Sequence, residues 1–376
     1  MNFELDPMYL ELQRQTLDLT RSIEPIACEA DASNEIHPGI LDALKHSGLS
    51  DLMVPAKYGG RFEKIDPLAI CVVREAMMAT SSHLDALFAL QGIGSYAVTV
   101  AGSDEQRSQW LPRIAAMDVL AALALTEPDA GSDLKSVTTE ITVDGKDLII
   151  NGAKAFISNA GAASFYLVFA KEDASFSMVL VPANAAGVTI SQAPELIAPH
   201  VLGDITFDNV KLPATARLGE AGQGFQLVLA TLAVFRASVA AAAVGLAQAA
   251  LDEAVRHTHS RIQFGKPLAR LGPVAQMLAD SWTEVEMARL LTYRAALAAR
   301  DEPGATLHYS SMAKLAASEM ASRVVDRCVQ MMGRFGLIHN SKIERLYRQA
   351  RPMRIYEGTS EILQLSIARE LAGIST

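Results

Sequence analysis

The spacing of apolar residues changes twice along the chain. From Tyr9 to about Met117 apolar positions recur every three or four residues, with interruptions at Pro25, His37-Pro38 and Tyr58-Gly-Gly60, which predicts a set of helices. Between about residues 120 and 222 the spacing falls to two. This pattern predicts strands at 140–143, 148–150, 165–169, 177–181 and 204–212. Helical spacing then returns, and helices are expected at 225–257, 272–300, 305–333 and 360–372.

This order of elements predicts an α+β protein that is mainly α. We expect an N-terminal helical domain (1–119), a middle small β-barrel domain (120–223) and a C-terminal helical bundle (224–376). The first two strands should form a hairpin with its turn at Asp144-Gly145. The helix at 225–257 is apolar on nearly every side, so it belongs at the centre of the bundle or at an oligomer interface.

Composition narrows the class of protein. The 376 residues carry a net charge of −9, which argues against nucleic acid as the main partner, because phosphate binding needs a basic surface. The longest apolar run starts at Ala237 and soon meets Asp252 and Glu253, so no membrane span is expected. The first residues lack the basic-then-apolar order of a secretory signal. Three scattered cysteines favour a reducing, cytoplasmic location.

The segment from Arg351 to Glu361 carries the best candidate for chemistry, Glu357. Pro352 ends the preceding helix and Gly358 leads into the N-cap of a last helix, which leaves Glu357 on a loop. Apolar neighbours can desolvate this carboxylate and raise its pKa, as a general base near neutral pH requires. The alternative is a glutamate that is solvated or only supports the start of the helix.

Other types of site lack their motifs. The sequence has no Glu-x-x-His pair for a di-iron centre, no Gly-x-Ser-x-Gly elbow and no Gly-Lys-Ser/Thr loop. His257 and His259 are two positions apart and would face different ways on a helix, so no metal site is expected. Gly92-Ile-Gly94 lacks the third glycine and the preceding strand of a dinucleotide fingerprint.

Three segments resemble those of the acyl-CoA dehydrogenase family, in the same order. They are Thr-Glu-Pro-Asp-Ala-Gly-Ser (126–132), Ala-Phe-Ile-Ser-Asn (155–159) and Ile-Tyr-Glu-Gly-Thr-Ser-Glu (355–361). The resemblance covers essentially the whole chain. It implies FAD-dependent α,β-dehydrogenation of an acyl-CoA thioester to the trans-2-enoyl thioester. Glu357 would take the α-proton, the β-hydrogen would leave as hydride, and the Glu357 backbone N–H and a flavin hydroxyl would hold the thioester oxygen.

The same resemblance implies the residues of the site. The expected cofactor-binding residues are Leu123, Leu125, Thr126, Gly131, Ser132, Phe156, Ile157, Ser158, Arg261, Phe264, Gln330, Gly333, Arg334, Thr359 and Glu361. The expected substrate-binding residues are Ser132, Arg236, Tyr356, Glu357 and Gly358. Arg261 would reach the flavin pyrophosphate of a neighbouring subunit in a homotetramer or homodimer. An electron-transfer flavoprotein or a similar acceptor is the implied partner. Without the family context, Phe156 is an ordinary core aromatic and Arg261 a cation at a helix end.

The sequence also departs from the family pattern. Gly272 stands where a glutamine is common, and Arg334 replaces the second glycine of Gln-x-x-Gly-Gly. Ala233 replaces an aspartate that contacts the pantetheine side of the thioester, and the stretch 196–203 is shorter than usual. These departures leave open a flavin oxidase or a dehydrogenase of carrier-protein thioesters. A non-catalytic helical assembly module is the alternative from another class. Phe235 stands where some relatives carry the base, so Glu357 has no rival.

Overall fold

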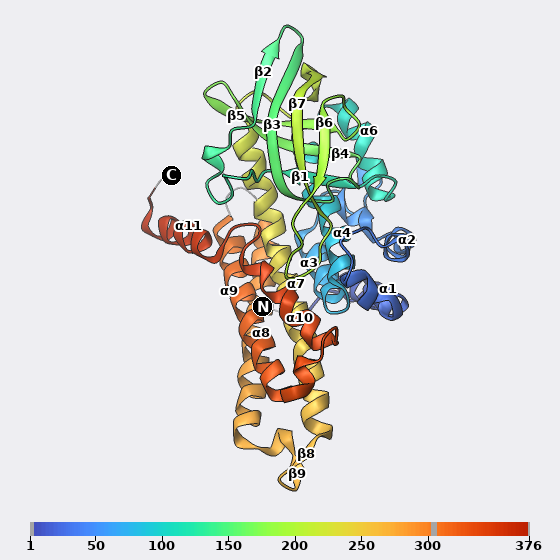
Figure 1. Cartoon of the computed structure of the whole chain (residues 1–376), viewed down its shortest axis with the longest axis vertical. Coiled ribbons are helices and arrows are strands. Elements are labelled where there is room, and N and C mark those ends of the chain that lie inside the picture. The colour runs from blue at the N-terminus through green and yellow to red at the C-terminus, as the bar shows by residue number, and fades with distance from the viewer. Residues whose placement is uncertain (1–3, 302–306, 375–376) are drawn as a thin grey trace. The chain divides into compact units, whose positions relative to one another are not determined.

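A computed structural model describes residues 4–301 and 307–374 (Figure 1). Helices come first, strands follow and helices return, as the apolar spacing predicts. The first group of helices is α1 (Pro7–Asp31), α2 (Pro38–Ser47), α3 (Pro67–Met78), α4 (Ser82–Ile93), α5 (Tyr96–Ala101) and α6 (Asp104–Ala115). The last group is α7 (Gly224–Ser260), α8 (Gly272–Asp301), α9 (Leu307–Met332), α10 (Lys342–Ala350) and α11 (Ser360–Ala372). The chain is therefore α+β and mainly α.

The chain divides into two compact units, which are described separately below. The first unit contains Met1–Ala32, Pro67–Asp85 and Ala233–Thr376, and the second contains Ser33–Asp66 and Ala86–Leu232. Each unit thus combines segments that are distant in the sequence.

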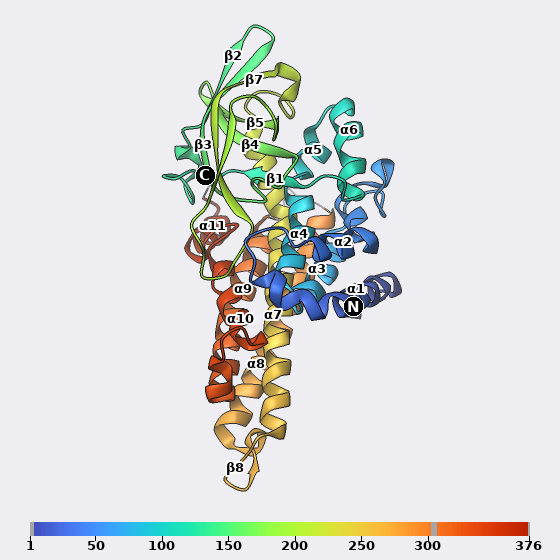
Figure 2. The ribbon, with the colours of Figure 1, turned by 45° about the vertical axis from the view of Figure 1, so that its right-hand side comes forward.

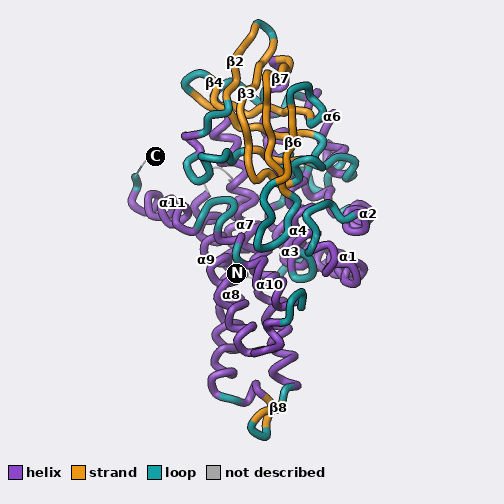
Figure 3. Tube along the Cα trace, in the orientation of Figure 1, coloured by secondary structure: helices purple, strands orange, loops and turns teal. Residues whose placement is uncertain are grey.

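A seven-stranded sheet forms the middle domain in the second unit. Its strands are β1 (Ala121–Ala124), β2 (Glu140–Asp144), β3 (Asp147–Ser158), β4 (Phe165–Glu172), β5 (Ser175–Pro182), β6 (Val188–Gln192) and β7 (Leu202–Pro213). The strand order is β1-β4-β2-β3-β7-β6, with β5 paired to β4. The sheet curls around a core to which Ile150, Tyr166, Val168 and Phe207 contribute buried side chains. Figure 3 shows the strands of this sheet gathered together.

The hairpin between β2 and β3 forms as predicted, but its turn is one residue later. Asp144 pairs with Asp147, so the two-residue turn is Gly145-Lys146 rather than Asp144-Gly145. Gly145 has a φ of 64°, a conformation that glycine adopts without steric cost. Its position in the turn therefore fixes the register of the hairpin.

The helical bundle of the first unit is built around α7. From Ala233 to Ala254 this helix is buried on nearly all sides, as its apolar pattern predicts. Gly245 allows α7 to approach α3 closely, because a Cβ there would lie 1.9 Å from the carbonyl oxygen of Glu75. Figure 2 shows α7 and α8 alongside each other, joined by the hairpin of β8 (Ile262–Gln263) and β9 (Lys266–Pro267).

Two helical stretches have the length and apolar character of a membrane span. They are Ser82–Ala101, whose most apolar stretch of 18 residues is 67% buried within the protein, and Gly224–Ser260, whose most apolar stretch is 83% buried. The second contains the apolar run for which no span was expected. Burial of this extent is typical of the core helices of globular proteins, which satisfy the same length and hydropathy criteria.

Several details of the helices differ from the predictions. Pro25 does not interrupt α1, because the buried face formed by Ile23, Ala27 and Ala30 continues past it. The helix α10 is the one that Pro352 is expected to end, but its bounds were not predicted, since it has nine residues and a strongly charged face. The expected start of α9 at 305 lies outside the described residues.

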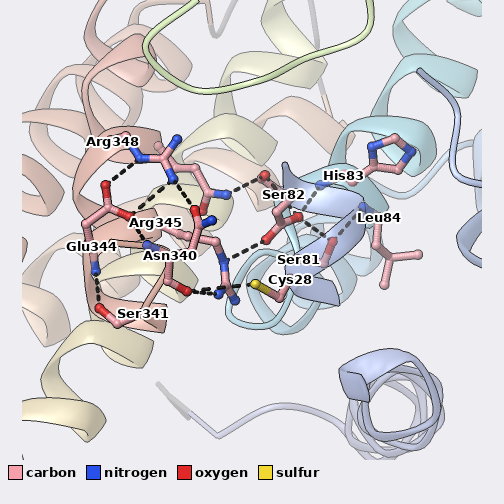
Figure 4. A network of polar contacts seen from close by, with 12 residues as sticks. Cys28, Ser81, Ser82, His83, Leu84, Asn340, Ser341, Glu344, Arg345 and Arg348 are labelled. Atoms are coloured by element: carbon pink, nitrogen blue, oxygen red, sulfur yellow. Dashed lines mark hydrogen bonds and ion pairs between the residues drawn. The ribbon is translucent and has the colours of Figure 1, made fainter. Parts of the chain in front are cut away.

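A polar network joins α1, the start of α4 and α10 within the first unit (Figure 4). The carboxylate of Asp31 accepts hydrogen bonds from the Ser81 hydroxyl at 2.7 Å and from the backbone N–H of His83 at 3.1 Å. Arg345 of α10 lies 3.8 Å from the same carboxylate. Burial raises the pKa of Asp31, and these hydrogen bonds and the arginine oppose that rise. The network therefore stabilises the packing of three helix segments.

Candidate functional site

Glu357 lies on the predicted loop of the first unit. A short 3-10 helix, Pro352–Arg354, precedes it, and α11 begins at Ser360. Thr359 caps α11 by accepting a hydrogen bond from the backbone N–H of Ile362 at 3.4 Å. Glu357 has a φ of 52° and Gly358 a φ of 102°, so the chain turns through two successive left-handed residues. A left-handed non-glycine residue needs support from its surroundings.

Two cations supply that support by binding consecutive carbonyl groups of the loop. Arg236 of α7 donates from Nε to the carbonyl oxygen of Glu357 at 2.8 Å. Lys314 of α9 donates from Nζ to the carbonyl oxygen of Gly358 at 2.7 Å. A Cβ at position 358 would lie 3.0 Å from Nη2 of Arg236, so this position favours glycine. Arg236 also donates to the Ser311 hydroxyl at 3.2 Å.

The carboxyl group of Glu357 is covered and only partly satisfied. Its Oε2 atom is buried and has no hydrogen-bond partner within residues 4–301 and 307–374. Burial raises the pKa of Glu357, and the positive charges of Arg74, Arg236 and Lys314 oppose the rise. Burial also lowers the pKa of Lys314 to about 8, although the Glu357 carboxylate acts in the opposite direction. The site thus combines a desolvated carboxyl group with nearby cations.

Arg74 is itself held by a buried ion pair. Its Nε and Nη2 atoms donate to the two carboxylate oxygens of Asp85 at 2.9 and 2.7 Å. Its Nη1 donates to the Ser238 hydroxyl at 2.8 Å. The side chains of Arg74 and Asp85 are 4% and 6% exposed, so this bidentate pair fixes the charge of Arg74 near the glutamate.

The expected flavin loop lies in the second unit. The Thr126 carbonyl accepts a hydrogen bond from the Ala155 N–H at 2.9 Å, and Glu127 pairs with Ala130 across the turn. Both side-chain oxygens of Glu127 are bound, Oε2 by the N–H and hydroxyl of Thr138 and Oε1 by the Lys154 ammonium at 2.9 Å. The bonds to the Glu127 carboxylate therefore hold the loop against Thr138 and against Lys154 of β3.

The Glu127–Lys154 pair is almost fully buried. The Lys154 side chain is 0% exposed and also donates to the Leu125 carbonyl at 2.8 Å. Burial raises the pKa of Glu127, but the hydrogen bonds from Thr138, Thr139 and Lys154 outweigh it and lower that pKa to about 2. Burial lowers the pKa of Lys154 to about 8 against the effect of Glu127. The sequence reading did not identify this pair, because its members are 27 residues apart.

Phe156 stands out on β3 of the same unit. It lies in a bulge of the β3–β7 ladder, between the pairs Lys154–Ile205 and Ile157–Gly203. Its φ is 56°, and its backbone N–H donates to the Asp204 carboxylate at 2.9 Å. Phe156 is 50% exposed, so it is not a core residue. The neighbouring Ile157 side chain is buried in the core of the sheet. Only its backbone is available to a cofactor.

Ser158, the last residue of β3, contacts a histidine that the sequence reading did not single out. The Ser158 hydroxyl lies 2.9 Å from Nε2 of His200. The two other expected residues of the 155–159 segment thus have different surroundings, Phe156 facing outward and Ile157 inward.

A third group of expected residues lies around the β8–β9 hairpin of the first unit. The guanidinium groups of Arg261 and Arg334 lie 5.8 and 5.1 Å from the ring centroid of Phe335. Phe264, with a φ of 53°, and Gly265 form the turn of the hairpin, and Phe264 is 88% exposed. Two arginines beside one aromatic ring bring positive charge that suits a phosphate group.

The remaining expected residues occupy ordinary positions. Leu123 lies in β1 and Leu125 directly after it, both partly buried. Gly131, Ser132, Gln330 and Gly333 are exposed, and Glu361 is exposed in the first turn of α11. Tyr356 precedes the glutamate, and its side chain is 39% exposed.

These residues suit a flavin dinucleotide. Phe156, which is half-exposed and has a strained backbone, offers an apolar face to a planar ring. Thr126, Ser132 and Ser158 belong to the same unit and offer hydroxyl groups. The Arg261–Arg334 pair offers positive charge to a pyrophosphate.

Comparison with known proteins agrees with this fit. Family models for the N-terminal, middle and C-terminal domains of acyl-CoA dehydrogenases match residues 11–118, 122–210 and 222–372. The chain is 36% identical, over 374 residues, to cyclohex-1-ene-1-carbonyl-CoA dehydrogenase of Geobacter metallireducens, covering 96% of this chain and 98% of the relative.

Solved structures give the same result. Butyryl-CoA dehydrogenase from Megasphaera elsdenii is similar with a TM-score of 0.94 and 29% identity, covering 99% of this chain and 100% of the other. A glutaryl-CoA dehydrogenase from Mycobacterium smegmatis in complex with FADH2 is similar with a TM-score of 0.92 and 26% identity, covering 98% of this chain and 95% of the other. The chain therefore belongs to the acyl-CoA dehydrogenase family of FAD-dependent oxidoreductases, which act on the CH–CH bond of acyl-CoA substrates.

Proposed function

We propose that Glu357 is the base that removes the α-proton of an acyl-CoA thioester, giving the trans-2-enoyl thioester. The observation that carries this proposal is the covered Oε2 atom of Glu357, which has no hydrogen-bond partner in the described part of the chain. It lies on a loop whose backbone two cations hold in a strained conformation. FAD, when bound, supplies the acceptor for the hydride that leaves the β-carbon. Detection of the enoyl-CoA product with an artificial electron acceptor tests the reaction.

The chain's own residues account for the proton transfer. Burial makes the Glu357 carboxylate a stronger base than a solvated glutamate, because its charged form is desolvated. The positive charges of Arg74, Arg236 and Lys314 oppose this rise in pKa and favour the ionised form that accepts the proton. The hydrogen bonds to the carbonyl groups of Glu357 and Gly358 hold the carboxyl in one place while it gains the proton.

We assign Arg236 and Lys314 to positioning the base. The Arg236 side chain was expected to contact substrate, and the structure directs its guanidinium to the loop carbonyl. Arg236 therefore acts through Glu357 in this proposal. Tyr356 and Gly358 remain proposed substrate contacts beside the base, together with Ser132 of the flavin loop.

The Lys314→Met variant tests this positioning by its pH profile. The free enzyme needs ionised Glu357, so kcat/KM rises with pH through the pKa of this group. Removing the Lys314 charge leaves Arg74, Arg236 and Asp85 facing Glu357, and the loss of one cation raises the pKa further. The acidic limb of kcat/KM should move to higher pH. Loss of the charge-assisted bond to Gly358 should also lower kcat about 10- to 100-fold.

The matched control is Lys314→Arg, which keeps the positive charge. Its acidic limb should stay at the parent pH even where kcat falls, because the electrostatic effect on Glu357 is retained. An unchanged limb in Lys314→Met would show that Lys314 does not act on the base.

The Arg261→Ala variant tests cofactor binding at the hairpin. We propose that Arg261 and Arg334 bind the pyrophosphate of FAD held mainly by another subunit of a homotetramer or homodimer. Losing one charge-assisted pair worth about 1.5–3 kcal/mol should weaken flavin retention about 10- to 100-fold. The measurement is the ratio of flavin to protein after gel filtration.

Arg256→Ala is the matched control, since Arg256 lies on the last turns of α7 and its side chain is 67% exposed. It removes the same charge without touching Phe335 and should leave the flavin content unchanged. Equal flavin content in the two variants would refute the role of Arg261. Dissociating the oligomer should also release flavin.

A second candidate within the family is dehydrogenation of a carrier-protein thioester, or oxidation with oxygen as the acceptor. Ala233 is buried and carries no carboxylate, so the expected contact to the pantetheine arm is absent, and the carrier of the acyl group stays open. Comparing the rates with coenzyme A thioesters and with carrier-protein thioesters identifies the carrier of the acyl group. Comparing the rates with an artificial electron acceptor and with oxygen separates a dehydrogenase from an oxidase. We further propose an electron-transfer flavoprotein as acceptor, a cytoplasmic location, and domain boundaries at 1–119, 120–223 and 224–376.

A further inference from the structure

His200 occupies a stretch that departs from the family pattern, and it lies directly against the end of β3. The Nε2 atom of His200 is 2.9 Å from the Ser158 hydroxyl. Both residues belong to the second unit, so this contact lies within one compact body.

The backbone on both sides fixes this contact. Ser158 pairs with Leu202 in the β3–β7 ladder, and the Asn159 N–H donates to the Val201 carbonyl at 2.9 Å. The N–H of His200 itself donates to the Asn34 side-chain oxygen at 3.1 Å. The imidazole is thus held against the hydroxyl by the neighbours of both residues.

We propose that His200 is a positioning residue for the cofactor, donating its Nε2–H to Ser158 so that the hydroxyl proton of Ser158 is left for the flavin ring. This inference rests on the proposed function, in which Ser158 contacts FAD. The edge of an oxidised flavin ring is rich in acceptors, namely N5 and two carbonyl oxygens. A serine hydroxyl has one proton, so it can donate to the ring only if its other neighbour does not take that proton.

The protonation state of His200 agrees with this assignment. Burial lowers its pKa to about 4, so the imidazole is neutral near pH 7. A neutral imidazole has one N–H donor and one acceptor nitrogen, and can therefore donate from Nε2. The contact then consists of two neutral groups and adds no net charge beside the ring.

The experiment compares flavin-loaded variants by the visible spectrum of the bound flavin and by the rate of flavin release on dilution. His200→Leu removes the partner of Ser158 and should release flavin about 3- to 10-fold faster, with a shifted flavin band. His200→Gln places an amide nitrogen where Nε2 stands and should resemble the parent. Ser158→Ala should resemble His200→Leu, and the double variant should be no worse than either, because both act through one hydroxyl.

His200→Glu tests the direction of the hydrogen bond. An ionised glutamate can only accept, so it would take the Ser158 proton and should behave like Ser158→Ala. The double variant His200→Glu/Ser158→Ala is the control. It carries the glutamate charge but has no hydroxyl at position 158, so it shows the effect of the charge alone. A Glu variant that matches the parent while the Leu variant does not would overturn the assigned direction.

Three further outcomes are distinguishable. A parent protein that holds flavin, with a His200→Leu variant identical in spectrum and release rate, overturns the role of His200 alone. Additive losses in the double variant also overturn it, since His200 would then act independently of Ser158. A parent protein that binds no flavin overturns the proposed function itself.

Discussion

The Glu357→Gln variant should fold, retain flavin and react with acyl-CoA about 10²- to 10⁴-fold more slowly than the parent, the usual contribution of a positioned general base. Glutamine keeps the size of the side chain, and the backbone bonds from Arg236 and Lys314 do not depend on the carboxylate. Only the group that accepts the α-proton is lost. Anaerobic stopped-flow measurement of flavin reduction gives the rate.

Glu357→Asp is the graded control for this prediction. It keeps the carboxylate but withdraws it by about one methylene, so its rate should lie between those of the parent and the Gln variant. A glutamate that only supported the loop would give the opposite pattern, with lower stability and near-normal flavin reduction. A Gln variant as fast as the parent would show that Glu357 is not the base.

The Lys154→Met variant should lower the free energy of unfolding by about 3–5 kcal/mol, because it leaves a buried carboxylate without its cation. The Lys154 and Glu127 side chains are 0% and 4% exposed, so water cannot replace the lost ammonium without rearrangement of the sheet. The Leu125 carbonyl loses its donor as well. Urea unfolding at neutral pH measures the effect as a lower midpoint.

Two controls isolate the buried pair. Lys211→Met removes an ammonium that pairs with Asp144 and Asp147 on the surface of the same sheet, where its side chain is 56% exposed, and should leave the midpoint unchanged. Adding Glu127→Gln to Lys154→Met should recover part of the loss, because the unpaired charge is then gone. A Lys154→Met midpoint equal to that of Lys211→Met would contradict the account.

The sequence predicts local features of this protein well. The loop position of Glu357 and the cap at Thr359 follow from Pro352 and Gly358, which restrict the backbone wherever they occur. The order of helices and strands follows from apolar spacing, which reports the side of each element that is buried. These signals depend on neighbours within a few residues.

The sequence does not show which distant residues meet. Lys314 and Gly358 are 44 positions apart, and Arg74 and Ser238 are 164 apart, so no local pattern links them. A lysine on a helix is usually solvated, and only the packing of α9 shows that Lys314 is buried beside the loop. No local pattern marks His200 either, because its partner Ser158 is 42 positions away in the sequence. Its partner Ser158 becomes evident only from the pairing of β3 with β7.

The most direct test of the account is anaerobic titration of the purified parent protein with acyl-CoA thioesters of short, branched and long chains, followed by visible spectroscopy and product analysis. The account predicts a yellow protein with an oxidised-flavin spectrum that at least one of these thioesters bleaches, with the matching trans-2-enoyl-CoA formed in equal amount to the flavin reduced. A flavin-loaded protein whose spectrum none of the thioesters bleaches would contradict it.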